Sequence, residues 1–236
     1  MFKKFCLALA IVSSVWASPE PNVLKGQARD SRGMPLTGVK VYADNTLLYN
    51  TNAIAVTDAA GKYSVKVGKP AGTWHATAQI ERKLNGQQYV FDLHPDNDDA
   101  FAGNLGAVRN FVWKLQGKRP QGGNYGGFVI AYGDITNLFY LNTEHVELTL
   151  EPQGNLVDGS AGKSISGLLQ RTPDGDAIPD VPVARYKISA RYTDPEHAGP
   201  LLVRARNQGE YSSHLVADFK VVMPTIHRIE VELRSP

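Results

Sequence analysis

The chain of 236 residues carries 25 Lys and Arg against 23 Asp and Glu, a formal charge of +2, and 42% of its residues are hydrophobic. The near-neutral balance argues against a general nucleic-acid binder, which normally has a basic excess, and the hydrophobic content argues against wholesale disorder. The 22 glycines and 14 prolines favour many short strands joined by turns over long helices.

Residues 1–17 are predicted to be a signal peptide. A basic start precedes an apolar run over residues 5–15, which is too short to span a bilayer core of about 30 Å as a helix. Val15 and Ala17 are the modest or small residues that a signal peptidase requires before a cut at Ser18. Cleavage there removes the only cysteine of the chain, so we expect a mature protein that forms no disulfide. The sequence thus predicts a soluble periplasmic or secreted protein with no stable membrane insertion after cleavage.

Short runs of alternating apolar and polar residues, bounded by Gly, Pro, Asn or Asp, recur along the rest of the chain. They cover residues 39–42, 63–67, 74–80, 111–115, 146–150, 186–192 and 229–233. Such alternation is typical of half-buried β-strands, and no window of 11 or more residues shows a helical period. We therefore expect an all-β protein of antiparallel β-sandwiches with little helix.

A glycine-rich segment at residues 117–127 divides the chain and is predicted to be a linker. It separates residues 22–116 from residues 128–236, and each block is expected to form a β-sandwich domain. The two blocks share a weak sequence similarity, because residues 70–78 and 182–190 both have an aromatic-x-φ-x-Ala run after a proline. This similarity indicates either duplication of one domain or coincidence.

Three motifs in residues 22–80 resemble carboxypeptidase regulatory-like domains. They are GQARDSRGMPLTGVKV at residues 26–41, TDAAGKYSV at residues 57–65 and GTWHA at residues 72–76, in the order and spacing of that family. Residues 81–115 match loosely. The resemblance implies a seven-stranded, transthyretin-like sandwich. It implies little about function, because such modules are appended to peptidases, transporters, adhesins and carbohydrate-active proteins alike.

The densest polar cluster, at residues 92–99, is a candidate metal site. Its carboxylates and imidazole could surround a hard cation such as Ca²⁺ with oxygen ligands, although the EF-hand pattern is absent. The alternative is a solvated acidic turn capped by its own side chains. The candidate ligands are Asp92, His94, Asp96, Asp98 and Asp99.

Aromatic residues suggest a second kind of site, because aromatic rings stack on the faces of sugars. Trp74 and Trp113 lie in the apolar phase of their strands and are expected in the core. Four aromatic residues in or after the linker remain as candidates for a binding surface, or for a packed seam between domains. They are Tyr125, Tyr132, Phe139 and Tyr140.

Basic residues in the second block share the polar phase of two predicted strands. We expect cross-strand ion pairs with the glutamates of neighbouring strands in preference to an anion site. The cations are Arg185, Lys187, Arg191, Arg204 and Arg206, and the glutamates are Glu147, Glu151, Glu230 and Glu232.

No phosphate-binding loop, nucleophile elbow or paired-histidine motif is present in the sequence. We therefore expect an exported, non-enzymatic binding or accessory protein without a required cofactor, with an extracytoplasmic protein or glycan as its partner. A carbohydrate-binding module that uses the loop aromatics, with or without calcium, is the first alternative. A hydrolase with an unrecognised site is the second.

Overall fold

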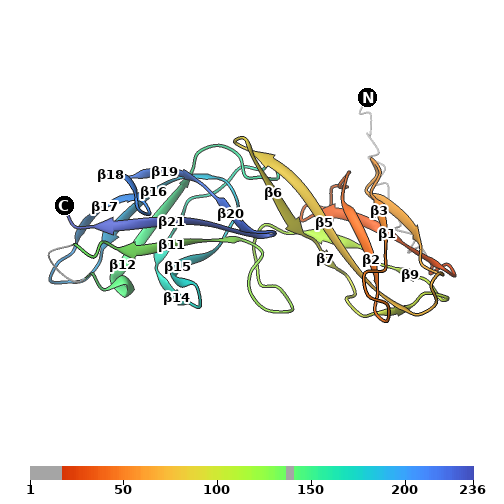
Figure 1. The fold of residues 1–236 in the computed structure, drawn as a ribbon. Helices are drawn as coiled ribbons and strands as arrows, with labels where there is room; N and C mark the ends of the chain where they lie inside the picture. Colours follow the sequence, from red (N-terminus) through yellow and green to blue (C-terminus); the bar gives the residue numbers. More distant parts are fainter. Residues whose placement is uncertain (1–17, 137–140) are drawn as a thin grey trace, which may run out of the picture.

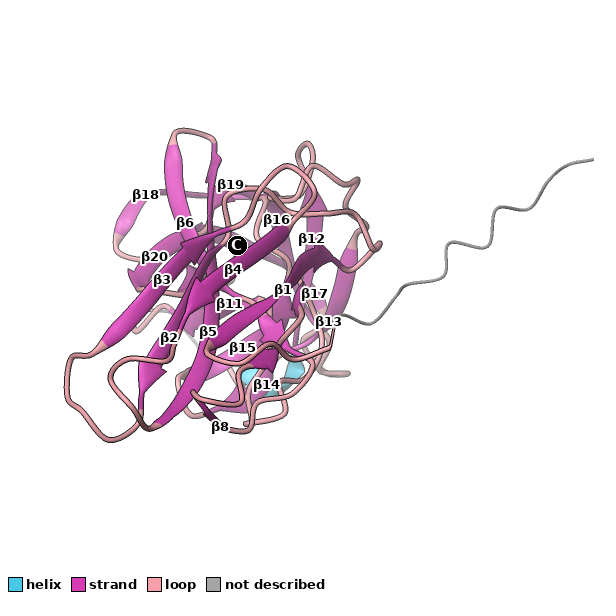
Figure 2. Ribbon diagram, turned by 90° about the vertical axis from the view of Figure 1, so that its right-hand side faces the viewer, coloured by secondary structure: helices cyan, strands magenta, loops and turns pink. Residues whose placement is uncertain are grey.

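A computed structural model describes residues 18–136 and 141–236 of the chain (Figure 1). These residues form an all-β structure of 21 strands and a single 3-10 turn, η1 (Thr143–His145), and strands dominate the view in Figure 2. The low helix content predicted from the sequence is thus confirmed for the described residues. The predicted signal peptide lies outside them.

The N-terminal half, residues 18–116, forms two five-stranded sheets. In one, the order is β4-β1-β10-β7 with β9 beside β1, and in the other it is β3-β2-β5-β6 with β8 beside β5. The strands are β1 (Val23–Asp30), β2 (Lys40–Asn45), β3 (Asn52–Val56), β4 (Lys62–Lys66), β5 (Thr73–Leu84), β6 (Gln87–Asp92), β7 (His94–Pro95), β8 (Phe101–Ala102), β9 (Ala107–Val108) and β10 (Phe111–Trp113).

The C-terminal half, residues 127–236, forms one eleven-stranded sheet in the order β13-β12-β16-β17-β21-β11-β15-β14, with β18, β19 and β20 beside this path. β17 joins the two parts of this sheet, because its first residues pair with β16 and its later residues pair with β21. The strands are β11 (Gly127–Gly133), β12 (Val146–Pro152), β13 (Ile165–Leu168), β14 (Gln170–Thr172), β15 (Gly175–Val181), β16 (Arg185–Tyr192), β17 (Gly199–Ala205), β18 (Gln208–Ser212), β19 (Leu215–Asp218), β20 (Lys220–Met223) and β21 (Ile226–Arg234).

Each of the seven runs of alternating residues overlaps a strand, and the phase of the alternation is correct. Trp74 is 1% exposed and Trp113 is 3% exposed, so both indoles belong to the core as predicted. Tyr63 is buried in the same cluster, and Val65 packs against it. Alternation places side chains correctly because successive residues of a strand point to opposite faces of the sheet.

The expectation of purely antiparallel sheets is wrong. β1 pairs in parallel with β9 and β10, and β11 pairs in parallel with β21. Alternation records which face is buried but not the direction of the neighbouring strand, so the pattern could not show this. In each half the first strand lies beside the last strand and runs in the same direction.

The two halves share this arrangement in further strands. β2 lies between β3 and β5, and β12 lies between β13 and β16. The similar residues 70–78 and 182–190 extend into β5 and β16. These two strands have corresponding neighbours, since β5 pairs with β2 and β16 pairs with β12. Duplication of one domain stays a prediction.

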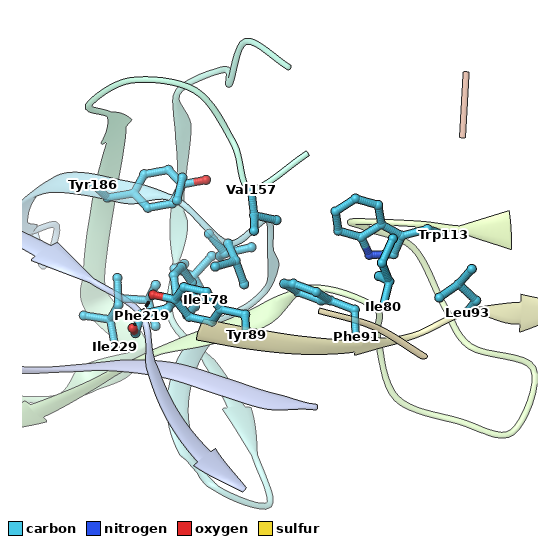
Figure 3. Close-up of a cluster of buried hydrophobic side chains, with 14 of the residues drawn as sticks. Ile80, Tyr89, Phe91, Leu93, Trp113, Val157, Ile178, Tyr186, Phe219 and Ile229 are labelled. Atoms are coloured by element: carbon cyan, nitrogen blue, oxygen red, sulfur yellow. Dashed lines mark hydrogen bonds between the residues drawn. The ribbon is translucent and has the colours of Figure 1, made fainter. Parts of the chain in front are cut away.

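Buried aromatic side chains join the halves. Figure 3 shows Tyr89 and Phe91 of β6 between Trp113 on one side and Phe219 on the other. The ring centroid of His227, on β21, lies 5.3 Å from that of Tyr89 and 4.9 Å from that of Phe91. The buried cluster of hydrophobic residues thus runs from one half into the other.

Candidate functional site

A cleft of about 360 Å³ opens beside β5 and is covered on one side by the glycine-rich segment. We call it the β5 cleft. The residues that line it come from β5, from the chain at and after the end of β6, and from residues 119–125. They are His75, Ala76, Thr77, Ala78, Gln79, Asp92, Leu93, His94, Pro95, Asp98, Arg119, Gln121 and Tyr125.

Asp98 connects the three segments around the cleft. One carboxylate oxygen, Oδ1, lies 3.1 Å from Nε2 of His75 on β5. The other, Oδ2, accepts a hydrogen bond of 2.6 Å from Nε2 of Gln121 in the glycine-rich segment. A carboxylate held at both oxygens has a fixed orientation, so it presents its remaining lone pairs in defined directions.

Asp92, which also lines the cleft, is held in a similar way. Its Oδ1 accepts a hydrogen bond of 3.0 Å from Nε2 of Gln79, and its Oδ2 lies 3.5 Å from Nη1 of Arg119. Both carboxylates are half-exposed, so these contacts contribute little to stability. The contacts instead fix the orientation of the two carboxylates and of the side chains that bind them.

Tyr125 forms the aromatic part of the wall and is 8% exposed. The ring of His94 meets it edge-on at a centroid distance of 6.3 Å, and the cationic groups of Lys114 and Arg119 each lie 5.5 Å from its ring centroid. Burial raises the pKa of Tyr125, and Arg119 opposes that shift. The Tyr125 hydroxyl is buried without a hydrogen-bond partner among the described residues.

The predicted linker is an ordered loop that runs between the two halves (Figure 1). Lys118 and Asn124 form an isolated β-bridge, and the Arg119 N–H donates to the Gly123 carbonyl at 3.1 Å. The carboxylate of Asp180, on β15, accepts hydrogen bonds from the N–H groups of Gly117 and Gly126 at 2.8 and 3.0 Å. The loop is therefore fixed to the C-terminal half and carries Arg119, Gln121 and Tyr125 to the cleft.

Four of the predicted site residues meet in this cleft: Asp92, His94, Asp98 and Tyr125. Asp96 lies elsewhere and accepts hydrogen bonds from the backbone and side-chain nitrogens of Asn110 at 3.0 and 2.7 Å. The Asp99 carbonyl accepts from Arg109 at 2.9 Å.

Tyr132, on β11, is also outside the cleft. The guanidinium of Arg206 lies 3.6 Å from its ring centroid, and its hydroxyl donates to Glu230 at 3.3 Å. Phe139 and Tyr140 lie outside the described residues.

Sequence reasoning did not identify four of the polar groups that line the cleft: Gln79, His75, Arg119 and Gln121. Gln79 and His75 were on the polar face of a strand, where exposed side chains are ordinary. Arg119 and Gln121 were within a segment read for its glycines and for Tyr125. The density of acidic residues at 92–99 and the loop aromatic Tyr125 were the signals that led to this cleft.

Among residues 18–136 and 141–236, no group of three or more His, Cys, Asp or Glu side chains is arranged to hold a metal ion. The calcium site and its alternative, a solvated acidic turn, both stay predictions. In the same residues, no helix is long and apolar enough to cross a membrane.

The basic residues predicted on the C-terminal half form ion pairs, four of them with the expected glutamates, whereas Arg185 pairs with Asp218. All five cations contact a carboxylate on a neighbouring strand. The pairs are Arg185–Asp218 at 2.6 Å, Lys187–Glu151 at 3.1 Å, Arg191–Glu147 at 3.7 Å, Arg204–Glu232 at 2.8 Å and Arg206–Glu230 at 3.4 Å.

No family model and no curated protein match the sequence. Among solved structures, the Bacillus anthracis TIE protein is similar over 91% of this chain at 12% identity and a TM-score of 0.38, and the chain spans 34% of its length. The C-terminal fragment of the pilus adhesin SpaC from Lactobacillus rhamnosus GG is similar over 92% of this chain and 98% of its own, at 9% identity and a TM-score of 0.27.

A putative cell adhesion protein from Bacteroides ovatus is similar over 88% of this chain and 100% of its own, at 9% identity and a TM-score of 0.25. At these identities and TM-scores, nothing about the ligand or partner of this protein follows from the similarities. The β5 cleft must therefore be interpreted from its own residues.

Proposed function

We propose that the protein is an exported, non-enzymatic binding protein whose ligand occupies the β5 cleft. The observation that carries this proposal is the convergence of polar side chains from three separate segments on one cleft. Asp92 and Asp98 are each held by two neighbouring side chains. Groups that are ordered before a ligand arrives lose less entropy on binding, which is what a recognition site requires.

We further propose that the two halves are two β-sandwich domains, the first of the carboxypeptidase regulatory-like, transthyretin-like kind. The aspartates of two of the motifs fix tight turns, which supports this proposal. Asp30 accepts hydrogen bonds from the N–H groups of Arg32 and Met34 at 2.9 Å, which fixes the turn after β1. Asp58 does the same for Ala60 and Lys62 before β4. Asp-centred turns of this kind explain why the motifs need those carboxylates.

Export to the periplasm or the cell exterior is proposed from the signal-peptide pattern of residues 1–17. Intact mass of the protein recovered outside the cytoplasm tests it, because the mature chain should begin at Ser18. Recovery of a mature species that still contains residues 1–17 would contradict the proposal.

The ligand-binding proposal is tested with arrays of immobilised glycans and peptides. Wild-type protein should be retained by at least one class of ligand, and Asp98→Ala should lose that retention because it removes the group that orders His75 and Gln121. Glu210→Ala is the matched control, since Glu210 is exposed on β18 outside the cleft. Equal retention of all three proteins would place binding elsewhere.

The same arrays separate binding from catalysis. His75 and Asp98 form an imidazole–carboxylate pair of the kind that general bases use, so the hydrolase alternative has a specific place to act. The mass of each retained ligand should be unchanged after incubation. Cleavage that disappears in His75→Ala would establish the hydrolase alternative instead.

A further inference from the structure

Three consecutive apolar side chains are exposed in the loop between β2 and β3. Leu47 is 71% exposed, Leu48 is 47% exposed and Tyr49 is 100% exposed. Single exposed apolar residues are ordinary on a soluble protein, but a run of three in contact with solvent normally has a function. The loop is therefore a candidate interaction surface, and none of its residues lines the β5 cleft.

Hydrogen bonds hold the backbone of this loop in place. The side chain of Asn45 is buried, and its Oδ1 accepts from the N–H groups of Leu47 and Leu48, each at 3.0 Å. The Asn45 N–H donates to the Thr51 carbonyl at 2.8 Å, which closes the base of the loop. An Asn side chain that pairs with the backbone ahead of it is a usual way to fix a turn. The apolar side chains are thus displayed on an ordered backbone.

Another exposed leucine comes from a second loop at the same end of the molecule. Leu105, between β8 and β9, is 66% exposed. The Thr46 N–H donates to the Thr73 carbonyl at 2.9 Å, which ties the first loop to the start of β5. The Gly103 N–H donates to the Gly72 carbonyl at 2.9 Å, which ties the second loop to the same place. We call the four exposed residues the apolar tip: Leu47, Leu48, Tyr49 and Leu105.

The apolar tip lies at the end of the N-terminal half that is distant from the C-terminal half. Both of its loops adjoin the first residue of β5, whereas the turn after β5 reaches the C-terminal half, where Nδ2 of Asn85 donates to Asp218 at 2.6 Å. The 12 residues of β5 separate these two ends by roughly 35–40 Å. In Figure 1, β9, which follows Leu105, marks the end with the apolar tip. The tip can thus approach a large flat surface without interference from the C-terminal half.

The charge balance at this end is positive. Residues 45–51, 67–73 and 102–106 include one charged side chain, the exposed Lys69, and Lys66 is exposed at the end of β4. Glu20 pairs with Lys25 at 3.0 Å, and Asp44 precedes the first loop. An anionic bilayer suits such a surface, because apolar side chains enter the headgroup region and each lysine near it adds attraction to anionic lipids. Tyrosine is also enriched at the boundary between membrane and water.

The chain that follows residues 1–17 begins beside the apolar tip. The Glu20 carbonyl packs so closely on Gly106 that a side chain there would clash, and the Val67 N–H donates to the Asn22 carbonyl at 2.9 Å. Glu20 follows Ala17 by three residues, at most about 11 Å of extended chain. The apolar run at residues 5–15, whenever it is attached and inserted in a bilayer, therefore holds the tip at the bilayer surface.

We propose that the apolar tip binds the surface of an anionic lipid bilayer. Its four apolar side chains enter the headgroup region, and Lys66 and Lys69 lie beside the lipid phosphates. The contact is shallow and reversible, and no segment crosses the bilayer. This inference goes beyond the proposed function, because it concerns a different surface from the β5 cleft.

The test is sedimentation with lipid vesicles of the protein that begins at Ser18, so that residues 1–17 contribute no apolar surface. One set of vesicles contains phosphatidylglycerol and phosphatidylcholine in equal parts, and the other contains phosphatidylcholine alone. We expect the protein to sediment with the mixed vesicles and to bind phosphatidylcholine more weakly.

Leu47→Ser combined with Tyr49→Ser should weaken binding to the mixed vesicles at least about tenfold, because two apolar side chains no longer enter the lipid. Both residues are exposed, so the fold should tolerate the change. Val222→Ser combined with Met223→Ser is the matched control, since both residues are exposed on β20 in the other half. The control should bind like wild type.

Lys69→Gln tests the electrostatic part of the contact. It should weaken binding to the mixed vesicles about fivefold and leave binding to phosphatidylcholine unchanged. Lys220→Gln, which changes an exposed lysine on β20, should bind both vesicles like wild type.

A fluorescent label locates the contact. The chain from Ser18 onward contains no cysteine, so Tyr49→Cys carries a single environment-sensitive fluorophore. Its emission should move to shorter wavelength when mixed vesicles are added, whereas the same label on Met223→Cys should not respond.

Failure to sediment with either kind of vesicle would overturn the inference, as would equal binding by wild type and the Leu47→Ser, Tyr49→Ser variant. Equal affinity for the two kinds of vesicle would overturn its anionic part. If the tip holds a second copy of this chain, wild type should self-associate in analytical ultracentrifugation, the double variant should not, and neither should bind vesicles. That result would also overturn the inference.

Discussion

The Tyr89 hydroxyl donates a hydrogen bond of 2.8 Å to the carbonyl oxygen of Phe219, which lies 130 residues further along the chain. Tyr89 is on β6 in the N-terminal half, and Phe219 lies between β19 and β20 in the C-terminal half. Both side chains are fully buried. Burial raises the pKa of Tyr89 to about 12, with a further contribution from Asp218 that Arg185 opposes. The bond joins the halves where water cannot replace either partner.

Tyr89→Phe should therefore destabilise the protein. It removes one donor from the buried Phe219 carbonyl, to which the side-chain amide of Gln87 also donates at 3.2 Å, so the loss should be about 0.5–1.5 kcal/mol. Chemical denaturation of wild type and variant measures the difference. Tyr49→Phe is the control, because Tyr49 is 100% exposed and its change should stay within about 0.5 kcal/mol. Equal stability of Tyr89→Phe and wild type would mean that the halves do not depend on this bond.

His227 makes stability depend on pH. Its imidazole is 3% exposed and lies between Tyr89 and Phe91. Burial and the positive charge of Arg119 lower the pKa of His227 to about 4, although Asp92 acts in the opposite direction. Above pH 6.5 the imidazole is neutral in both folded and unfolded chains. As the pH falls from about 6.5 to about 4, the unfolded chain binds a proton that the folded chain does not, so stability decreases.

The loss from this group should reach roughly 3 kcal/mol near pH 4. His227→Phe keeps an aromatic ring in the same space and should show a smaller loss of stability between pH 7 and pH 4 than wild type. Denaturant titrations at several pH values measure it. His214→Phe, an exposed histidine, should follow the wild-type curve. If the His227→Phe curve coincides with the wild-type curve, the acid sensitivity comes from other groups.

The strands could be predicted from the sequence, because burial of one face imposes a period of two that turns then interrupt. Val146–Leu150 and Tyr186–Tyr192, for instance, read correctly as strands from alternation alone. The parallel pairing of β11 with β21 could not be read in this way. Their partners are chosen over a separation of about a hundred residues, and alternation is the same for either direction.

The candidate site was predictable only in part, for a related reason. Asp92 and Asp98 stood out because like charges close together in sequence are unusual. Gln121 and Gln79 did not, since a single amide side chain carries no local signal.

Trp74 and its neighbour His75 test the phase of β5. Trp74→Ala removes a fully buried indole and should cost about 3–5 kcal/mol. His75 is half-exposed and contacts Asp98, and exposed ion pairs contribute about 0–1 kcal/mol, so His75→Ala should cost no more than that. Denaturation midpoints and slopes of the two variants provide the comparison. Similar losses would show that the alternation along β5 does not separate core from surface.

Calcium should leave the melting temperature unchanged. Asp92 and Asp98 already contact protein donors at both oxygens, and Asp96 accepts from Asn110 outside the cleft. A cation would have to displace these donors and draw together carboxylates that face different partners. A ligand specific for the folded state stabilises it by about 2.7 kcal/mol at a hundred times its Kd, which a thermal scan detects. Scans with millimolar Ca²⁺ and with chelator should superimpose. An upward shift that Asp96→Ala combined with Asp98→Ala abolishes would show instead that the acidic loop binds the ion.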